Sequence, residues 1–296
     1  MTIQLDRMAL DDVGANPIRL AEAIHEQLGD RPGPVEVEAI ARALDIVEIR
    51  KAPLTNIEAA LITTRERDCG SILVNASSSR QRQRFSIGHE LGHFLNPWHQ
   101  PTSADGFQCN RSDMIVRDRE SADRHLRQEA EANSFAIEML APRKLVRPYL
   151  LPKPDLRHVL GMAEDLDLSR EAAARRYVEL HDENLAVVFG KDDRFSYAES
   201  CVGFPSLCLK KGDPVATAGT RREAPLSRIE QVDAEDWLYR PNPHQLMAQT
   251  LHQQNGFSIT LLRTSSSADD GDDDDDSGID DAYERLTRPI GERLKR

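Results

Sequence analysis

The segment FSIGHELGHFL, residues 85–95, constrains the fold of this chain more than any other feature. His89 and His93 are four residues apart, so on a helix both imidazoles face the same way, one turn above the other. The rest of the segment is mostly apolar or glycine, which predicts a buried helix. Burying two histidines and Glu90 is costly unless they have partners, so we expect a metal site here.

Glu90 adds a chemical role to this helix. It is expected beside the two histidines, where its carboxylate can hold a water molecule at the ion and take its proton. Zinc lowers the pKa of bound water to about 7, so a nearby carboxylate completes the activation. The pattern H-E-x-x-H is typical of metallopeptidases. The sequence therefore predicts Glu90 as a general base.

Zinc needs a third protein ligand, and the sequence offers two candidates. His99 completes the spacing H-E-x-x-H-x-x-G-x-x-H, with Asn96 in the glycine position. The other candidate is a carboxylate in QEAEANSFAIEMLAP, residues 128–142. At about 100° per residue, Glu129 falls at the centre of the apolar helix face, whereas Glu131 falls on the polar, solvated side. We favour Glu129, because a lone buried carboxylate needs a partner, and place His99 behind the ligands, at the rim or in solvent.

The segments RQRFSIGHELGHF and EAEANSFAIEMLAP, in this order, resemble the ImmA/IrrE metallopeptidases. The resemblance covers residues 16–180. It implies zinc on His89, His93 and Glu129, with Glu90 as the general base. Members of this family typically cleave a helix-turn-helix repressor, which de-represses stress-response or mobile-element genes. Some also carry a β-rich, sensor-like module after the peptidase.

The whole chain is expected to be an α+β protein with four parts. Residues 1–150 are predicted to form a mostly helical, zincin-like peptidase domain with a small N-terminal sheet. Residues 151–183 are predicted to form a helical, helix-turn-helix-like subdomain, and residues 184–264 a β-rich, sensor-like module. Residues 265–296 are expected to be a disordered acidic tail, since such a run repels itself and buries nothing.

Local patterns add predictions about single elements. AALITT and GSILVN are expected to pair as a hairpin. LAVVFG and RFSYAES are expected to form strands around the turn-like KDD, and a further hairpin is expected across Asn255-Gly256. Residues 206–215 are expected to continue the strand pattern. Ser78, with Gln81 three residues later, has the form of a capping box at the start of the motif helix.

A polar loop is expected from residue 97 to residue 120. Cys109 lies in this loop. We favour the interpretation that it has no role; the alternative is a fourth ligand that blocks water from the metal.

Composition narrows the class of protein. The net charge is −12, and residues 265–296 hold eleven acidic and five basic side chains, so bulk charge does not support nucleic-acid binding. The chain has no run of 18 apolar residues and no signal-peptide pattern. Its four cysteines form no C-x-x-C pair. We therefore expect a cytoplasmic protein with reduced thiols and no membrane partner.

The favoured function is a zinc-dependent endopeptidase, with Mn²⁺ as the alternative metal. Its expected substrate is a protein, most specifically a helix-turn-helix repressor of the XRE type. One alternative is a non-catalytic zinc-binding regulator that sequesters a transcription factor, which a closed site with four protein ligands would support. The residue that stabilises the oxyanion stays open, with His125, Tyr149 and His158 as candidates.

Direct DNA binding through residues 156–180 is the third function considered. This segment has a helix-turn-helix character and contains Arg170, Arg175 and Arg176. Because the chain is acidic, we expect instead a helical subdomain packed on the peptidase domain, with these arginines on its solvated face.

Overall fold

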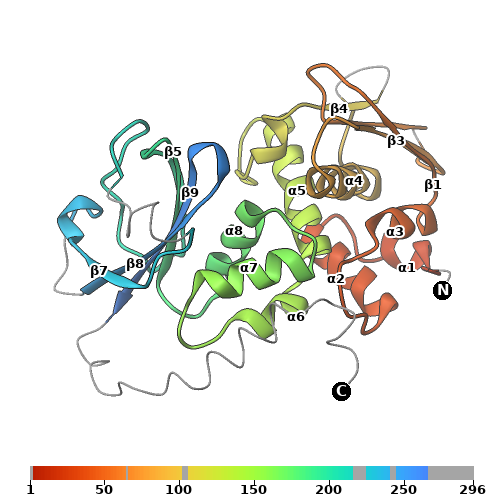
Figure 1. Ribbon diagram of the computed structural model, residues 1–296. Helices are drawn as coiled ribbons and strands as arrows, with labels where there is room; N and C mark the ends of the chain where they lie inside the picture. The colour runs from red at the N-terminus through yellow and green to blue at the C-terminus, as the bar shows by residue number, and fades with distance from the viewer. Residues whose placement is uncertain (1–2, 65, 102–105, 216–224, 241–244, 266–296) are drawn as a thin grey trace. The chain divides into compact units, whose positions relative to one another are not determined.

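The computed structural model describes residues 3–64, 66–101, 106–215, 225–240 and 245–265 (Figure 1). The chain divides into two compact units, Met1–Leu145 and Val146–Arg296. Each contains helices and one sheet, which confirms the predicted α+β class. Across the described ranges, no helix is both long and apolar enough to cross a membrane. The predicted acidic tail lies outside the described residues.

The first unit is built on a four-stranded sheet in the order β1-β3-β2-β4. β1 and β3 are parallel, and β2 is antiparallel to both β3 and β4, so the predicted hairpin of β2 and β3 is confirmed. The elements of this unit are α1 (Arg7–Asp11), α2 (Pro17–Leu28), α3 (Val37–Ala43), β1 (Ile46–Ala52), β2 (Ala59–Thr63), β3 (Gly70–Asn75), α4 (Arg80–Leu95), β4 (Phe107–Cys109), η1 (Asp113–Ile115) and α5 (Arg124–Leu140), followed at the unit boundary by α6 (Arg143–Val146) and η2 (Arg147–Tyr149).

β4 lies inside the segment that was expected to be a loop, so that prediction is wrong for this strand. Cys109 pairs with Ala59 and Phe107 with Leu61 of β2. The strand begins after Gly106, whose φ is +108° and where a Cβ would collide with the Leu61 carbonyl. This pairing joins segments far apart in sequence, and the local pattern of residues 97–120 contains no sign of it.

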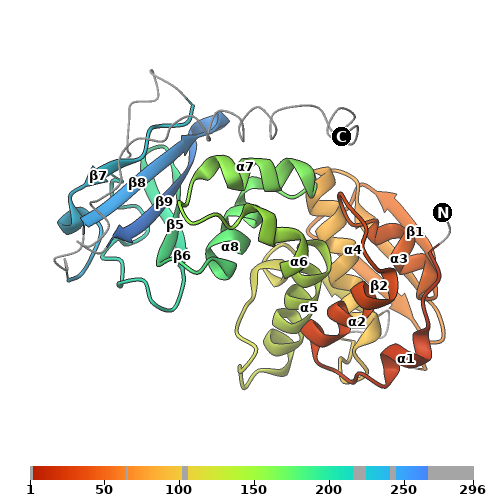
Figure 2. The same cartoon turned by 90° about the horizontal axis from the view of Figure 1, so that it is seen from below.

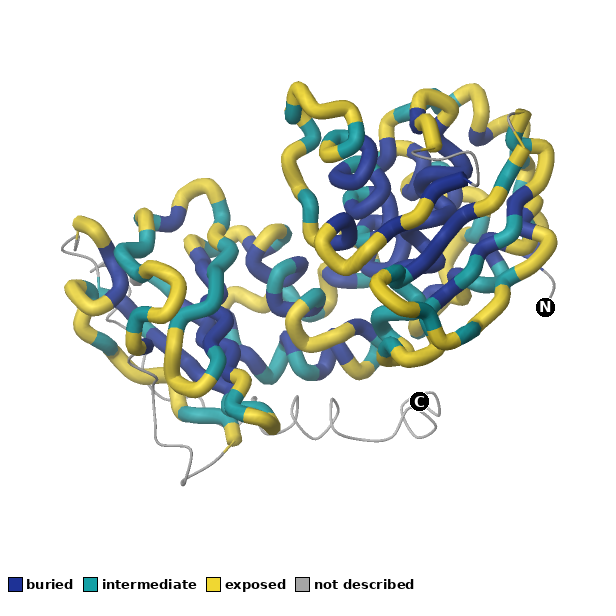
Figure 3. The backbone as a smooth tube through the Cα atoms, turned by 90° about the horizontal axis from the view of Figure 1, so that it is seen from above, coloured by how far each residue is buried: buried dark blue, intermediate teal, exposed yellow. Residues whose placement is uncertain are grey.

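α4, the motif helix, begins one residue later than predicted. Its N-cap is Ser79, whose side chain accepts a hydrogen bond from the Arg82 amide. Ser78 instead donates its hydroxyl to the Glu58 carboxylate at 2.6 Å. α4 packs between the sheet and α5, and it is among the most deeply buried segments of the first unit (Figure 3).

Two glycines allow α4 and α5 to approach closely. A Cβ at Gly92 would lie 3.1 Å from the Phe135 ring, and a Cβ at Gly88 would lie 3.4 Å from the Ala136 methyl group. Gly88 and Gly92 are four residues apart, as are Ala132 and Ala136, so small residues meet along one stripe of each helix. The same stripe of α5 begins with Glu129, which brings its carboxylate to α4.

The second unit is an antiparallel sheet in the order β6-β5-β9-β8-β7 (Figure 2). Both predicted hairpins form: Asp192 and Asp193 make the first turn and Asn255-Gly256 the second, all with positive φ. Residues 206–215 make only isolated bridges, contrary to the predicted strand. The elements are α7 (Leu156–Asp165), α8 (Arg170–Leu180), β5 (Leu185–Lys191), β6 (Arg194–Ser200), β7 (Glu230–Val232), η3 (Ala234–Asp236), β8 (Gln245–His252), η4 (Gln254–Gly256) and β9 (Phe257–Ser265).

α7 and α8 pack on this second sheet, and a core around Trp237 gathers buried side chains of β5, β8 and β9. Arg170 of α8 is exposed, as expected, but Arg175 and Arg176 are not on a solvated face. The Arg175 guanidinium lies 4.9 Å from the Tyr197 ring centroid, and Arg176 is 3% exposed and paired with Glu179 at 3.1 Å. Arg170 contacts Gln253 at 3.4 Å. Arg175 and Arg170 thus link α8 to other segments of its own unit, whereas Arg176 pairs within the helix.

Candidate metal centre

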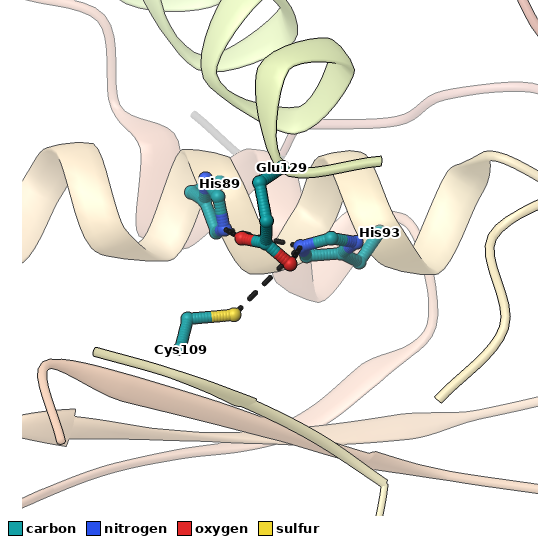
Figure 4. Close-up of side chains that lie close together, drawn as sticks. All are labelled: His89, His93, Cys109 and Glu129. Carbon is teal, nitrogen blue, oxygen red and sulfur yellow. Dashed lines mark hydrogen bonds and ion pairs between the residues drawn. The ribbon is translucent and has the colours of Figure 1, made fainter. Parts of the chain in front are cut away.

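Three predicted ligands meet between α4 and α5. Figure 4 shows the His89 and His93 imidazoles from α4 on either side of the Glu129 carboxylate from α5. Glu129 Oε2 lies 3.1 Å from His89 Nε2, and Oε1 lies 3.5 Å from His93 Nε2. The two Nε2 atoms are 3.0 Å apart. All three residues are buried, so the helical angle correctly placed Glu129 inside.

Cys109 joins this cluster from β4. Its sulfur is 3.7 Å from His93 Nε2, and one donor atom from each of the four residues lies within 4.8 Å of all the others. Burial raises the pKa of the Cys109 thiol well above its usual value. Cys109 is therefore a buried strand residue beside the cluster and not the loop cysteine that the sequence predicts.

His89 is oriented by a residue that the sequence analysis did not single out, Asn133. The Asn133 amide nitrogen donates to the carbonyls of Asp113 and Val116, so its oxygen is left to accept from His89 Nδ1 at 2.8 Å. His89 Nδ1 therefore carries the proton, and Nε2 turns its lone pair to the cluster. The position of Asn133 on the apolar face of α5, one residue after Ala132, was the available signal.

His93 is oriented in the same way by His99. His99 Nε2 lies 2.9 Å from the Glu131 carboxylate and donates to it, which leaves His99 Nδ1 as the acceptor for His93 Nδ1 at 2.9 Å. His99 is 2% exposed and lies behind His93, not at the rim or in solvent. Glu131 is only partly solvated, because it is the partner of His99.

The donor set fits a divalent cation. With both Nδ1 atoms protonated, two imidazole lone pairs and a carboxylate converge with no proton between them. Tetrahedral zinc sets its nitrogen and oxygen ligands about 3.3 Å apart, and the observed separations run from 3.0 to 3.5 Å. Burial lowers the pKa of His93 to about 3, which keeps it neutral. Burial lowers the pKa of His89, but the Glu129 and Glu90 carboxylates and the Asn133 side chain together raise it above its usual value, so the cluster attracts positive charge.

Glu90 is buried beside the cluster, and its carboxylate is not satisfied. Neither oxygen has a hydrogen-bond partner within the part of the chain that the structure describes, although the side chain is 0% exposed. Burial raises the pKa of Glu90 to about 7, against the opposing effects of the His89 imidazole and the Cys109 thiol. A buried carboxylate of this kind is a characteristic of functional sites.

Arg67, in the loop between β2 and β3, holds the end of the motif helix. Its guanidinium donates to the carbonyls of His93 at 2.7 Å and Phe94 at 3.2 Å, and also to those of Asn96 and His99. The last carbonyls of a helix have no partner within the helix, and a cation there is favourable. No local sequence pattern predicts this contact.

The three candidates for oxyanion stabilisation differ in position. His125, one turn before Glu129 on α5, lies 3.5 Å from the Glu129 carboxylate. Tyr149 donates to Asp165 at 2.7 Å, and His158 lies 3.2 Å from the Tyr177 hydroxyl, both within the second unit. Of the three, only His125 contacts the cluster.

Residues 45–177 match the sequence model of a peptidase family described as the IrrE N-terminal-like domain. This segment forms an IrrE N-terminal-like domain. The IrrE-like domain contains α4, β4 and α5, and therefore all four residues of the cluster. The resemblance inferred from the two sequence motifs is confirmed.

One solved structure, a Mycobacterium tuberculosis transcriptional regulator, has the same overall fold. It is 14% identical, with a TM-score of 0.50, and the alignment covers 88% of this chain and 93% of that chain. No curated protein matches the chain.

Proposed function

We propose that the IrrE-like domain is a zinc-dependent endopeptidase acting on a protein substrate. His89, His93 and Glu129 would hold the metal, because they converge in a buried site with their lone pairs unprotonated. Zn²⁺, or Mn²⁺ in its place, supplies a Lewis acid that polarises the peptide carbonyl.

The position and state of Glu90 are the main support for this proposal. A catalytic base must lie beside the reacting centre and have a pKa near the working pH. Glu90 is fully buried next to the cluster, has no hydrogen-bond partner among the described residues, and has a pKa of about 7. It would hold a water molecule, take its proton, and pass that proton to the leaving amine.

The proposed substrate is a helix-turn-helix repressor of the XRE type, whose cleavage de-represses stress-response or mobile-element genes. Support comes from the family to which the IrrE-like domain belongs, and the structural neighbour is itself described as a transcriptional regulator. A cytoplasmic location, in line with four free cysteines, is part of the proposal.

Glu90→Gln tests the chemistry. The variant should bind zinc as tightly as the unaltered protein and should not cleave a helix-turn-helix repressor encoded beside its gene, as followed by gel electrophoresis. Glu129→Gln is the contrasting variant, which should lose both metal and cleavage. Cleavage at an unchanged rate by the Glu90 variant would exclude Glu90 as the base.

A second function is favoured by one observation, the position of Cys109. A site with four protein ligands is typical of structural zinc, and a protein with such a site could sequester a transcription factor without cutting it. The endopeptidase proposal explains the unsatisfied carboxylate of Glu90 and the regulator does not, so we prefer the former. The arginines of α8 give no support to DNA binding, since their guanidinium groups contact side chains of their own unit.

A further inference from the structure

Cys109 reaches the cluster because β4 pairs with β2 in a defined register. Phe107 and Cys109 are two residues apart on the strand, so their side chains share one face. On that face the Phe107 ring stacks on the His93 imidazole, with centroids 4.6 Å apart. Cys109 itself is 1% exposed. The ladder with β2 therefore holds the sulfur against the metal cluster (Figure 4).

The distance between the Cys109 sulfur and the His93 imidazole is close to that expected for two ligands of one zinc ion. Tetrahedral zinc sets a sulfur and a nitrogen ligand about 3.5 Å apart, and Cys109 Sγ is 3.7 Å from His93 Nε2. The other candidate for a further ligand is His99. Its two ring nitrogens are used by His93 and Glu131, so neither faces the cluster.

We propose that Cys109 is the fourth protein ligand and that it keeps the resting site closed. This inference rests on the proposed function, because it concerns the regulation of the same site. Catalytic zinc sites have three protein ligands and keep one position for water, whereas four protein ligands leave none. The chain is then a latent peptidase, in which the thiolate occupies the place that a hydrolytic water needs.

Glu90 supports a latent site rather than a purely structural one. Its carboxylate is fully buried beside the Cys109 thiol, yet neither oxygen has a hydrogen-bond partner among the described residues. A structural zinc site has no need of such a group. Movement of the sulfur away from the cluster would leave space beside Glu90, where a water molecule would satisfy the carboxylate.

Cobalt substitution of the full chain tests the closure. Co²⁺ bound with Cys109 should show a thiolate-to-metal charge-transfer band in the near ultraviolet, together with the visible bands of a tetrahedral site. Azide, a small anion that binds at an open position, should not change the visible bands. Cys109→Ala should lose the charge-transfer band, keep bound Co²⁺, and respond to azide.

Two further variants make the outcome decisive. Cys69→Ala removes an exposed cysteine and should behave like the unaltered protein. Cys109→Ser keeps the size of the side chain and should also lose the band, so a folding defect of the alanine variant does not decide the result.

The inference is overturned if the unaltered protein binds Co²⁺ without the charge-transfer band, or if azide changes its visible bands. Either result leaves the proposed function intact, since His89, His93 and Glu129 would then form an open site. Absence of Co²⁺ binding in every variant would instead remove the proposed function itself.

Discussion

Single residues behind the ligands decide how the two imidazoles of the cluster are presented. Asn133 fixes His89, and the pair His99 and Glu131 fixes His93, each through the ring nitrogen that faces away from the cluster. Such hydrogen bonds set the tautomer of a ligand and raise its basicity. The centre therefore depends on residues that do not touch the metal position.

His99→Phe tests this dependence. The substitution removes the acceptor for His93 Nδ1, so zinc affinity should fall by about 10- to 100-fold, as measured by competition with a chelating dye. Trp98→Phe, at the adjacent and 75% exposed position, is the control and should bind zinc normally. Equal affinity in both variants would show that His99 does not orient His93.

At the scale of elements, the packing of α4 against α5 places the residues of the cluster. α4 and α5 approach closely at Gly88 and Gly92, and this brings Glu129 to the histidines. α5 is also covered by α2, so Glu138 is buried at 7% although, seven residues after Glu131, it shares the helix face that was predicted to be polar. A helix buried on two sides does not follow the rule of a single apolar face.

Gly92→Val should separate the two helices. A Cβ at Gly92 already lies 3.1 Å from Phe135, so the larger side chain should destabilise the first unit by about 1–3 kcal/mol. Zinc affinity should fall with it, since Glu129 moves away from α4. Gly88→Ala is the matched control: its Cβ meets Ala136 at an ordinary contact distance, and chemical denaturation should show no loss of stability.

The whole molecule consists of two units with separate cores and one tryptophan each. Trp98 belongs to the unit that holds the cluster and is exposed, whereas Trp237 is 1% exposed in the core of the second unit. All four residues of the cluster lie in the first unit. Metal binding should therefore stabilise one unit directly and not the other.

Trp98→Phe leaves Trp237 as a fluorescent reporter of the second unit. Zinc at about 100 times its dissociation constant should stabilise the first unit by about 2.7 kcal/mol, seen as a shifted unfolding transition in circular dichroism. The Trp237 fluorescence transition should not move. A shift of both transitions by the same amount would mean that the two units unfold together.

The sequence by itself determined the cluster's first three members. Helical periodicity is local, so a spacing of four puts His89 and His93 on one face, and the angle of Glu129 turns it into the core. The hairpins of the second unit were predictable for the same reason, because Asp192, Asp193 and Asn255-Gly256 adopt the turn conformations that their residue types favour.

Only the tertiary structure decided the position of Cys109 beside the cluster. It depends on the pairing of β4 with β2, whose partners Cys109 and Ala59 are distant in sequence, and no local pattern encodes such a pairing. Arg67 at the end of α4 and His99 behind His93 depend likewise on the packing of separate segments. Periodicity specifies which face of an element a side chain occupies, but the fold alone specifies what lies opposite that face.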